Sequence, residues 1–553
     1  MPALTENTRG LPPSVRWMLA VPGALLILFL IAQLLLSVFL DDAIGDYLKK
    51  EFHTSTGGVY QLKYDDLDLS LWSRSAKLQN IHIQPDSPSD DDPGRTPVHG
   101  KAHVQTLKIN KISLWAYLFG NTLAIGSVVI DRPVVHIDHI HSMMKKSNPS
   151  FSSVDSSLYA ILDGSFSVFK LNAFEIRNGT FSLTKEGEDK AFASAEELNF
   201  GLRNIRVDSA SARSGRLFLT DNAELDISGY EMNLPGDFYT VRLNNLRLTS
   251  SNRQLRVDSL QLIPRLPRYD FSAKKGVQTD RIELLIHTIS LNEMDVPRLA
   301  DSGRLYAETL VIDNTDLEVV QNMAKPSLPG RSPKLPRLAF SRLPCPVKID
   351  TISIEHTDIK YTEYREGAAH PGSVTFKNTR ASITGFSNYQ KDLESNHIVT
   401  LNARTNVMGK GLLNTLFTFY PNDPEGIHLI EGNLGKMRFS DFNPALENLA
   451  FARMEGTIHS MNFNMKLNKE KAQGSVVLRY EDLNVELLRN AEPEQGVGKR
   501  IKSFITNTFF IKKSNKKPPL REGEIKFERD DQKSVFNYWW KALSTGLKDS
   551  IGL

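Results

Sequence analysis

The stretch FEIRNGTFSL, residues 174–183, carries the pattern that decides the fold of this chain. Two apolar residues that alternate with a polar one lie on each side of four turn-forming residues, Arg177 to Thr180. Asn-Gly is the strongest two-residue hairpin signal, because a type I′ turn needs two positive φ angles. The stretch therefore predicts a β-hairpin with one apolar face. The Asn178-Gly179-Thr180 sequon also fits a glycan acceptor, although turn chemistry is sufficient to explain it.

The same pattern of apolar-x-apolar, four turn residues and apolar-x-apolar recurs at 128–137, 310–319 and 352–361. The copies are degenerate and unevenly spaced, which argues against a strict solenoid. Other runs alternate at 198–207, 217–227, 241–248, 255–262, 282–289, 397–402 and 475–488. Between residues 41 and 490, short helices are expected at 41–53, 150–162, 292–299 and 408–420. The sequence predicts a mainly β fold, an elongated and curled antiparallel sheet that forms a groove.

In one predicted strand the apolar residues shift from one set of alternate positions to the other. In VYQLKYDDLDLSLW, residues 59–72, the apolar positions alternate in one parity up to Tyr64 and in the other from Leu67. A slip of one residue turns the apolar set to the opposite face. A bulge or kink at Asp65-Asp66 is therefore expected.

A sheet with one apolar face must cover it with a second sheet, with helices or with acyl chains. The expected helices are too few for so many strands. This leaves a sandwich-like packed core or a groove that holds lipid, and the sequence does not separate the two. The residues expected to line either one are Phe174, Ile176, Phe181, Leu183, Ile312, Leu317, Ile352 and Ile359.

An uncharged run precedes the body, WMLAVPGALLILFLIAQLLLSVFL at residues 17–40. At about 1.5 Å per residue it is long enough to cross a hydrocarbon core of about 30 Å. A cleaved signal peptide is the alternative, but that class has a shorter apolar region. Arg9 and Arg16 precede the run and three Asp residues follow it. The positive-inside rule thus predicts a cytoplasmic segment 1–16, an anchor at 17–40 and an exported body.

Composition narrows the class of protein. The chain has 553 residues, 40% hydrophobic and 24% charged, which is typical of a folded protein. The net charge of +3 is too small to suggest nucleic acid as a partner. The single cysteine, Cys345, excludes an internal disulfide, which suits a bacterial periplasm better than a eukaryotic lumen. The expected segments of the body are two β-groove segments at 41–322 and 347–490, joined by a proline-rich linker at 323–346.

The composition changes again after residue 490. Residues 491–523 place an apolar stretch between basic clusters, and residues 524–553 have helical spacing of aromatic and apolar residues. One interpretation is a terminal amphipathic helix packed on the sheet end. The other is contact with a membrane or an acidic partner. The residues assigned to such a contact are Lys499, Arg500, Lys502, Lys512, Lys513, Trp539 and Trp540.

The search for chemistry finds no P-loop, no G-x-G-x-x-G after a strand, no G-x-S-x-G and no H-E-x-x-H. His136, Asp138, His139 and His141 cluster, but an extended strand directs them to opposite faces, and zinc needs convergent ligands. Cys345 has no His or second Cys nearby. No enzyme activity, metal or other cofactor is expected.

The unit ISLWAYLFGNTLAIGSVVIDRPVVHI, residues 112–137, resembles the N-terminal signature of the AsmA-like envelope proteins. The preceding strand and anchor stand where that family has them, so the resemblance covers roughly residues 15–140. It implies a single-pass bacterial inner-membrane protein with a periplasmic body, similar to bridge-like lipid-transfer proteins. Phospholipid or another acyl lipid is the implied ligand, and an outer-membrane or envelope partner is implied at the C-terminal end. The favoured function is lipid binding and transfer or envelope homeostasis; the alternative is a non-transporting envelope scaffold.

Overall fold

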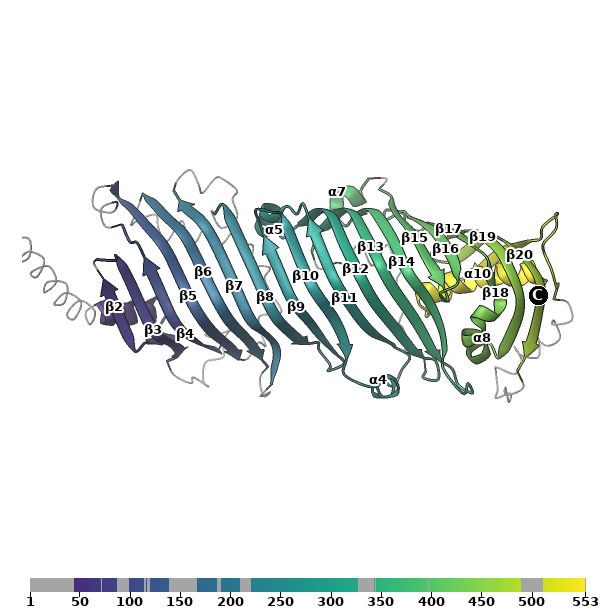
Figure 1. The fold of residues 1–553 in the computed structure, drawn as a ribbon, viewed down its shortest axis with the longest axis horizontal. Helices are drawn as coiled ribbons and strands as arrows, with labels where there is room; N and C mark the ends of the chain where they lie inside the picture. Colours follow the sequence, from purple (N-terminus) through teal and green to yellow (C-terminus); the bar gives the residue numbers. More distant parts are fainter. Residues whose placement is uncertain are drawn as a thin grey trace, which may run out of the picture.

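The computed structural model describes residues 44–70, 72–86, 99–113, 116, 120–138, 167–185, 190–208, 220–326, 343, 345–395, 397–488 and 511–552. They form one 21-stranded sheet that curls, with a few short helices at its margins and ends (Figure 1). The predicted mainly β fold, a long curled sheet with few helices, is confirmed.

The strands follow one another along the chain. The first half contains β1 (Tyr60–Lys63), β2 (Asp66–Ser70), β3 (Ser75–Pro85), β4 (His99–Asn110), β5 (Thr122–Asp138), β6 (Val168–Thr184), β7 (Ala191–Val207), β8 (Asn222–Asn233), β9 (Tyr239–Thr249), β10 (Gln254–Pro264) and β11 (Asp280–Asn292). The second half contains β12 (Leu305–Asn322), β13 (Val347–Tyr364), β14 (Gly372–Ser387), β15 (Val399–Val407), β16 (Gly411–Phe419), β17 (His428–Leu434), β18 (Met437–Arg438), β19 (Ala452–Leu467), β20 (Lys471–Leu487) and β21 (Glu522–Glu528).

The sheet is mixed, so the prediction of a purely antiparallel sheet was wrong. Most neighbouring strands pair antiparallel, but β5 pairs with β6 in parallel, and β12 pairs with β13 in parallel. Residues 323–346, the predicted linker, connect β12 to β13. Because these two strands pair along their length, hydrogen bonding is continuous from the first predicted β segment to the second.

The four repeated motifs do not form hairpins. Each copy lies within one long strand, β5, β6, β12 or β13, which continues through the four supposed turn residues. A type I′ turn needs two consecutive positive φ angles, whereas each motif has one, at Arg132, Asn178, Asn314 or His356. A single residue of this kind makes a β-bulge and leaves the strand running on.

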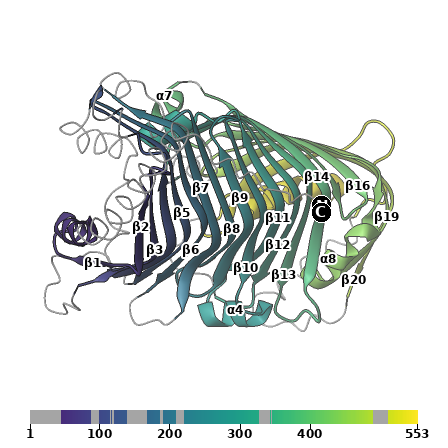
Figure 2. The same ribbon diagram turned by 60° about the vertical axis from the view of Figure 1, so that its left-hand side comes forward.

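These bulges fall on a line across the sheet. Asn314 and His356, for example, both stand between the paired positions Asp313–Glu355 and Thr315–Thr357. Positive-φ residues also interrupt the neighbouring strands at Asn80, Gly229, Ser259 and Asn378. Bulges bend strands, and Figure 2 shows the strands curving along their length. Apolar positions on the two sides of each bulge are an odd number of residues apart, so the extra residue keeps them on one face.

The expected break at Asp65-Asp66 is confirmed. β1 and β2 both pair with β3, and the interruption between them lies opposite Asn80, whose φ is positive. The Asn80 side-chain amide donates to the Asp65 carboxylate at 2.8 Å, which joins the two irregular positions. The parity rule that identified this bulge applies to the four repeated motifs as well.

The helices are few and lie at the margins and the two ends of the sheet. They are a helix at 44–55, α4 (Arg268–Lys275), α5 (Val296–Ser302), α7 (Gln390–Leu393), α8 (Asn443–Leu449), α10 (Val535–Ile551) and the 3-10 turn η4 (Phe439–Phe442). Figures 1 and 2 place α7 and α4 at opposite margins. The helix expected at 408–420 was wrong, because that segment is mostly β16, with Leu413, Phe417 and Phe419 on alternate positions.

The helix expected at 150–162 and the anchor at 17–40 lie outside the described residues. Within the part of the chain that the structure describes, no helix is both long enough and apolar enough to cross a membrane. Helix 44–55 accords with the helical continuation expected at 41–53.

Candidate functional site

One face of the sheet carries an unbroken row of apolar residues, which we call the first apolar row. Each member pairs directly with the next across the hydrogen-bond ladder, and every strand from β2 to β19 except β18 contributes one residue. The members are Leu67, Leu78, Leu107, Ile130, Ile176, Phe200, Leu225, Leu248, Leu255, Leu291, Leu310, Ile352, Ile383, Leu401, Phe417, Ile430 and Met465. Such a row makes the face continuously apolar.

A second apolar row lies on the other side of the line of bulges. It runs from β5 to β15 through Ile137, Leu183, Ala193, Met232, Val241, Leu262, Leu284, Leu317, Ile359, Phe376 and Val407. Because strands lie about 4.8 Å apart, this row extends over roughly 50 Å. The two rows define the apolar face of the sheet.

The eight residues predicted to line this face are distributed over both sides of the bulges. Ile176 and Ile352 belong to the first row, and Leu183, Leu317 and Ile359 belong to the second. Phe174 and Ile312 lie beside the first row, where they pair with Val128 and Ile354. Phe181 pairs with Val135 beside the second row. All eight thus share the alternation of the apolar face, although the hairpins that led to their selection do not form.

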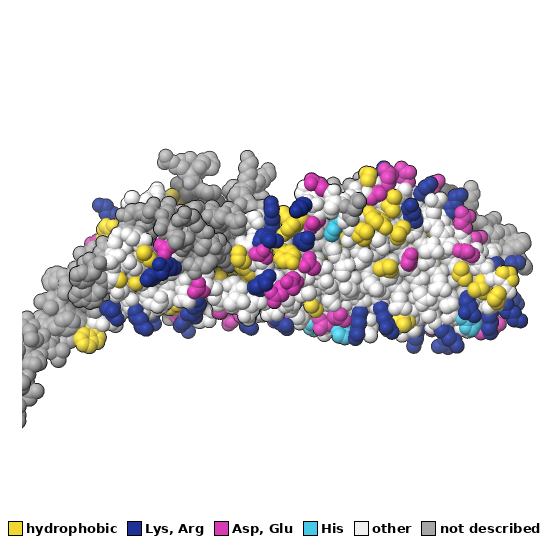
Figure 3. All heavy atoms as spheres, turned by 90° about the horizontal axis from the view of Figure 1, so that it is seen from above, with side chains coloured by type: hydrophobic (Ala, Val, Ile, Leu, Met, Phe, Trp, Pro, Cys, Tyr) yellow, Lys and Arg dark blue, Asp and Glu magenta, His cyan; other side chains and the backbone are white. Residues whose placement is uncertain are grey.

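The opposite face, here the outer face, carries ion pairs between neighbouring strands. Arg247 bonds Asp226 at 2.7 Å, Arg242 bonds Glu231 at 2.7 Å, and Lys377 bonds Asp358 at 2.7 Å. Figure 3, seen from above, shows charged side chains along the lower margin, which corresponds to the side facing the viewer in Figure 1. Exposed pairs of this kind contribute little stability each, about 0–1 kcal/mol. These ion pairs make the outer face polar and hydrated, in contrast to the apolar face.

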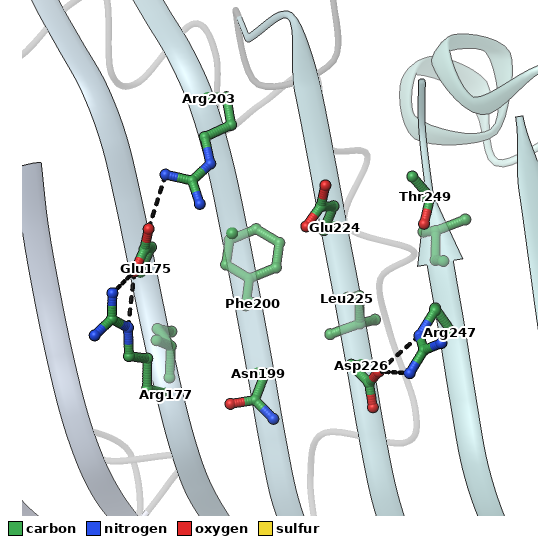
Figure 4. A pocket seen from close by; sticks show the side chains of 13 residues that line it. Glu175, Arg177, Asn199, Phe200, Arg203, Glu224, Leu225, Asp226, Arg247 and Thr249 are labelled. Atoms are coloured by element: carbon green, nitrogen blue, oxygen red, sulfur yellow. Dashed lines mark hydrogen bonds and ion pairs between the residues drawn. The ribbon is translucent and has the colours of Figure 1, made fainter. Parts of the chain in front are cut away.

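A shallow hollow of about 210 Å³ lies on the outer face around Gly201, because glycine has no side chain to fill this position (Figure 4). Glu175 lies beside it and contacts Arg177 and Arg203, the latter at 2.8 Å. Burial alone would raise the pKa of Glu175, but the hydrogen bonds and charges of the two arginines outweigh it and hold that pKa below its ordinary value. Arg247 is likewise paired with Asp226, so each arginine of the hollow forms an ion pair with a carboxylate of the same hollow.

Helices cover the apolar face at its two ends. At the N-terminal end, Ile44 and Leu48 of helix 44–55 pack on Leu67, Leu78 and their neighbours. At the C-terminal end, α10 packs on β15 to β21 in the largest buried cluster of the described residues. Along one margin, Val296 and Leu299 of α5 pack near the first row from β9 to β14.

The middle of the apolar face is different. From β5 to β13, no member of the second apolar row belongs to any of the three buried clusters that the described residues form. The same holds for the first-row residues Ile130, Ile176, Phe200 and Leu225. These side chains are mostly half-buried. We call this part of the face the open strip.

Helix α10 begins with Ser534 as its N-cap, whose hydroxyl accepts from the Asn537 amide. Tyr538, Ala542, Gly546 and Ser550 face the sheet, and Gly546 comes so close to Gly523 that a Cβ atom at Gly523 would collide with the Gly546 carbonyl oxygen. The terminal amphipathic helix is therefore present, but its buried side is made of smaller residues than the aromatic face expected from the sequence.

The residues predicted for membrane or partner contact do not form one patch among the described residues. Lys499, Arg500 and Lys502 lie outside the described residues. Lys512 and Lys513 are exposed beside the end of α10, where the Lys512 amide donates to the Ile551 carbonyl. Trp539 is packed against Phe417 and donates its indole N–H to His428 at 2.9 Å, whereas Trp540 is 49% exposed.

A polar group lies on the apolar face near the start of α10. Tyr361, two residues beyond Ile359, donates to Gln321 at 2.9 Å, and Glu363 follows it on the same face. Burial raises the pKa of Glu363 above its ordinary value, although Arg365, Lys541 and Lys533 act in the opposite direction. Burial, together with Glu363 and Asp280, also raises the pKa of Tyr361. Charges of both signs therefore gather beside the open strip.

The histidine cluster gives no metal site within the part of the chain that the structure describes. His136 lies between Asp138 at 2.7 Å and the Ser182 hydroxyl at 2.7 Å, while His139 and His141 lie outside the described residues. The Thr184 hydroxyl bond, followed by the His136 interactions, holds the pKa of Asp138 below its ordinary value.

Sequence reasoning missed the apolar-face residues of β7 to β11, such as Phe200, Leu225, Leu262 and Leu284. Their alternating runs were identified, but alternation alone does not say which residues share a face when a bulge interrupts the strand. The positions of Gly229 and Ser259, where the parity changes, are the signal that would have assigned them.

No protein-family model matches this chain, and no characterised protein of similar sequence was found.

Proposed function

We propose that this protein binds acyl lipids along the open strip of its apolar face and takes part in lipid transfer or homeostasis in the cell envelope. In this proposal it is anchored in a bacterial inner membrane by residues 17–40, with its sheet in the periplasm. The observation that carries the proposal is the pair of apolar rows, of which the open strip is covered by no helix among the described residues.

The dimensions of the strip suit this ligand. The second apolar row extends over roughly 50 Å, and the hydrocarbon core of a bilayer, two acyl chains thick, is about 30 Å. More than one acyl chain therefore fits along the row. A continuous apolar patch of this size on a monomer marks a binding surface, because exposing it to water is unfavourable.

The alternative function is an envelope scaffold that transports nothing. It requires the apolar face to be filled by side chains at the density of a protein interior. The C-terminal end of the sheet has that character, since Leu467, Ala472 and Val476 are completely buried. The half-buried residues of the open strip favour the lipid-binding function instead.

The test is mass spectrometry of the organic extract of gently purified full-length protein. We expect phospholipid in stoichiometric or greater amount. Leu284→Glu, which places a charge in the second apolar row, should strongly reduce the lipid-to-protein ratio. The matched control is Leu285→Glu, the same change on the neighbouring residue, which lies on the outer face between Gln261 and Asp316.

Circular dichroism of both variants checks that the sheet is intact. If the wild-type extract contains no phospholipid, the scaffold function is preferred. If Leu284→Glu and Leu285→Glu keep the same lipid content as the wild type, the lipid is not bound by the open strip and the proposal is wrong.

A further inference from the structure

Helix α10 occupies the part of the apolar face on which the open strip would otherwise continue. Phe417 and Ile430 of the first row, and Phe376 and Val407 of the second, belong to the buried cluster that α10 completes. The Trp539 ring lies 5.2 Å from the ring of Phe417. Helix α10 thus covers the two rows on β14 to β17, whereas the rows are half-exposed on the strands that precede them.

The side of α10 that adjoins the strip is aromatic and exposed. Phe536 is 48% exposed and Trp540 49%, whereas Tyr538 between them is 1% exposed. Residues four apart lie on the same side of a helix. The Phe536 ring lies 5.8 Å from that of Tyr361 in β13, which stands on the apolar face just beyond the second row. The exposed aromatic side therefore begins where the open strip stops.

Charged groups surround the same point. Asp280 pairs with Gln321, and Gln321 pairs with Glu363, so the two acids lie on the strands on either side of β12, on the face of Tyr361. Burial raises the pKa of Glu363, and the charges of Lys533 and Lys541 lower it. The Lys533 ammonium also donates to Gln278 at 3.4 Å. Carboxylates suit an ammonium group and lysines suit a phosphate. Side chains of both kinds stand next to an apolar surface here.

We infer that α10 is the end wall of the open strip and forms a terminal phospholipid site. An acyl chain packs against Phe536 and Trp540, and a headgroup with both an ammonium and a phosphate lies among Asp280, Glu363, Lys533 and Lys541. This inference rests on the proposed function and deepens it. A lipid that reaches this site does not continue under α10.

The experiment measures tryptophan fluorescence of the full-length protein loaded with phosphatidylethanolamine brominated on its acyl chains. Bromine quenches an indole only near contact. Trp17, Trp72 and Trp115 are replaced by Phe, which leaves Trp539 and Trp540. The matched variant additionally carries Trp540→Phe, an exposed position whose change leaves the packed Trp539 in place. A third protein carries Leu284→Trp in the Trp540→Phe background, as a reporter of the open strip.

We expect strong quenching of the protein that contains Trp540 and little quenching when Trp539 is alone. Leu284→Trp should restore strong quenching. If the Leu284→Trp reporter is quenched and Trp540 is not, lipid binds the strip but the terminal site is wrong. If neither is quenched, the proposed function fails as well.

The headgroup part is tested with brominated phosphatidylglycerol, which lacks the ammonium. The protein that keeps Trp539 and Trp540 should show stronger quenching by phosphatidylethanolamine, and Glu363→Gln in the same background should lose that preference. Glu318→Gln is the control, because Glu318 lies on the outer face, where it pairs with Arg268 and Lys360. Equal preference in Glu363→Gln and Glu318→Gln would contradict the assignment of the headgroup.

Discussion

At the scale of single residues, His428 joins α10 to the sheet. It is 1% exposed, its Nδ1 lies 3.0 Å from the Gly426 carbonyl, and its Nε2 lies 2.9 Å from the indole nitrogen of Trp539. An indole N–H only donates, so Nε2 accepts and Nδ1 carries the hydrogen. The ring is thus neutral. Burial lowers its pKa, with a contribution from the charge of Arg529, and the Gly426 carbonyl only partly opposes this.

This arrangement predicts a loss of stability in mild acid. The folded protein holds His428 neutral at a pH where the unfolded chain, with a pKa near 6.5, already binds a proton. The unfolded state therefore binds more protons below that pH, and stability falls as the pH decreases from about 7 toward 5. Thermal unfolding measured between pH 8 and 5 should show this fall. His428→Gln should have a flatter profile over the same range; an identical profile would mean that other groups cause it.

At the scale of secondary-structure elements, the bulge decides whether a strand continues or turns. Asn178-Gly179 looks like the centre of a hairpin, and its local chemistry does not distinguish one positive φ from two. The difference comes from the neighbours, since β6 already has β5 on one side and β7 on the other. Element type, alternation and the shared face of the eight lining residues could be predicted from the sequence. Strand direction and the parallel pairs could not, because alternation within a strand does not say in which direction the next strand joins the sheet.

The bulge residues should tolerate glycine and resist β-branched side chains. Asn314 has a φ of 54°, a conformation that costs most residues about 1–2 kcal/mol. Asn314→Val should therefore lower the free energy of unfolding by about that amount, and Asn314→Gly should leave it nearly unchanged. Asp316→Val, two residues further on the outer face of β12, is the control. Chemical denaturation compares the three, and equal effects of the two Val variants would refute the role of the bulge.

The contact between α10 and β21 depends on two glycines. A Cβ at Gly523 would lie 2.0 Å from the Gly546 carbonyl oxygen, whereas one at Gly546 would meet the side chains of Ile525 and Val476. Side chains adjust more easily than backbone, and Ala gains about 1 kcal/mol over Gly within a helix. Gly523→Ala should thus destabilise the protein more than Gly546→Ala. Gly201→Ala, where no atom lies within 4 Å of the added Cβ, should be nearly neutral in the same denaturation experiment.

At the scale of the whole molecule, the described residues form a curled sheet with one charged face and one apolar face. A helix closes each end, and both helices lie on the apolar face. The sequence indicated the one-sided sheet because apolar residues recur with fixed alternation. The sequence could not show where the apolar face is covered, since that depends on how α5 and α10 pack against strands that are distant in the sequence.

The proposed membrane anchor and its orientation can be tested directly. The charges around residues 17–40 predict a cytoplasmic N-terminus and an exported sheet. A reporter enzyme that is active only outside the cytoplasm, fused after Leu553, should be active. A second fusion with a reporter that is active only in the cytoplasm should be silent. The reverse pattern would place the sheet on the cytoplasmic side.

The order of the strands has a consequence for how the protein assembles. Every strand pairs only with strands close to it along the chain. A structure whose units contact only their nearest neighbours can grow by propagation from one end. As the chain emerges during synthesis, each new strand can join the edge left by the previous one without waiting for residues still to come. The growing edge is then the aggregation-prone part, and the arrival of α10 against β20 and β21 ends its growth.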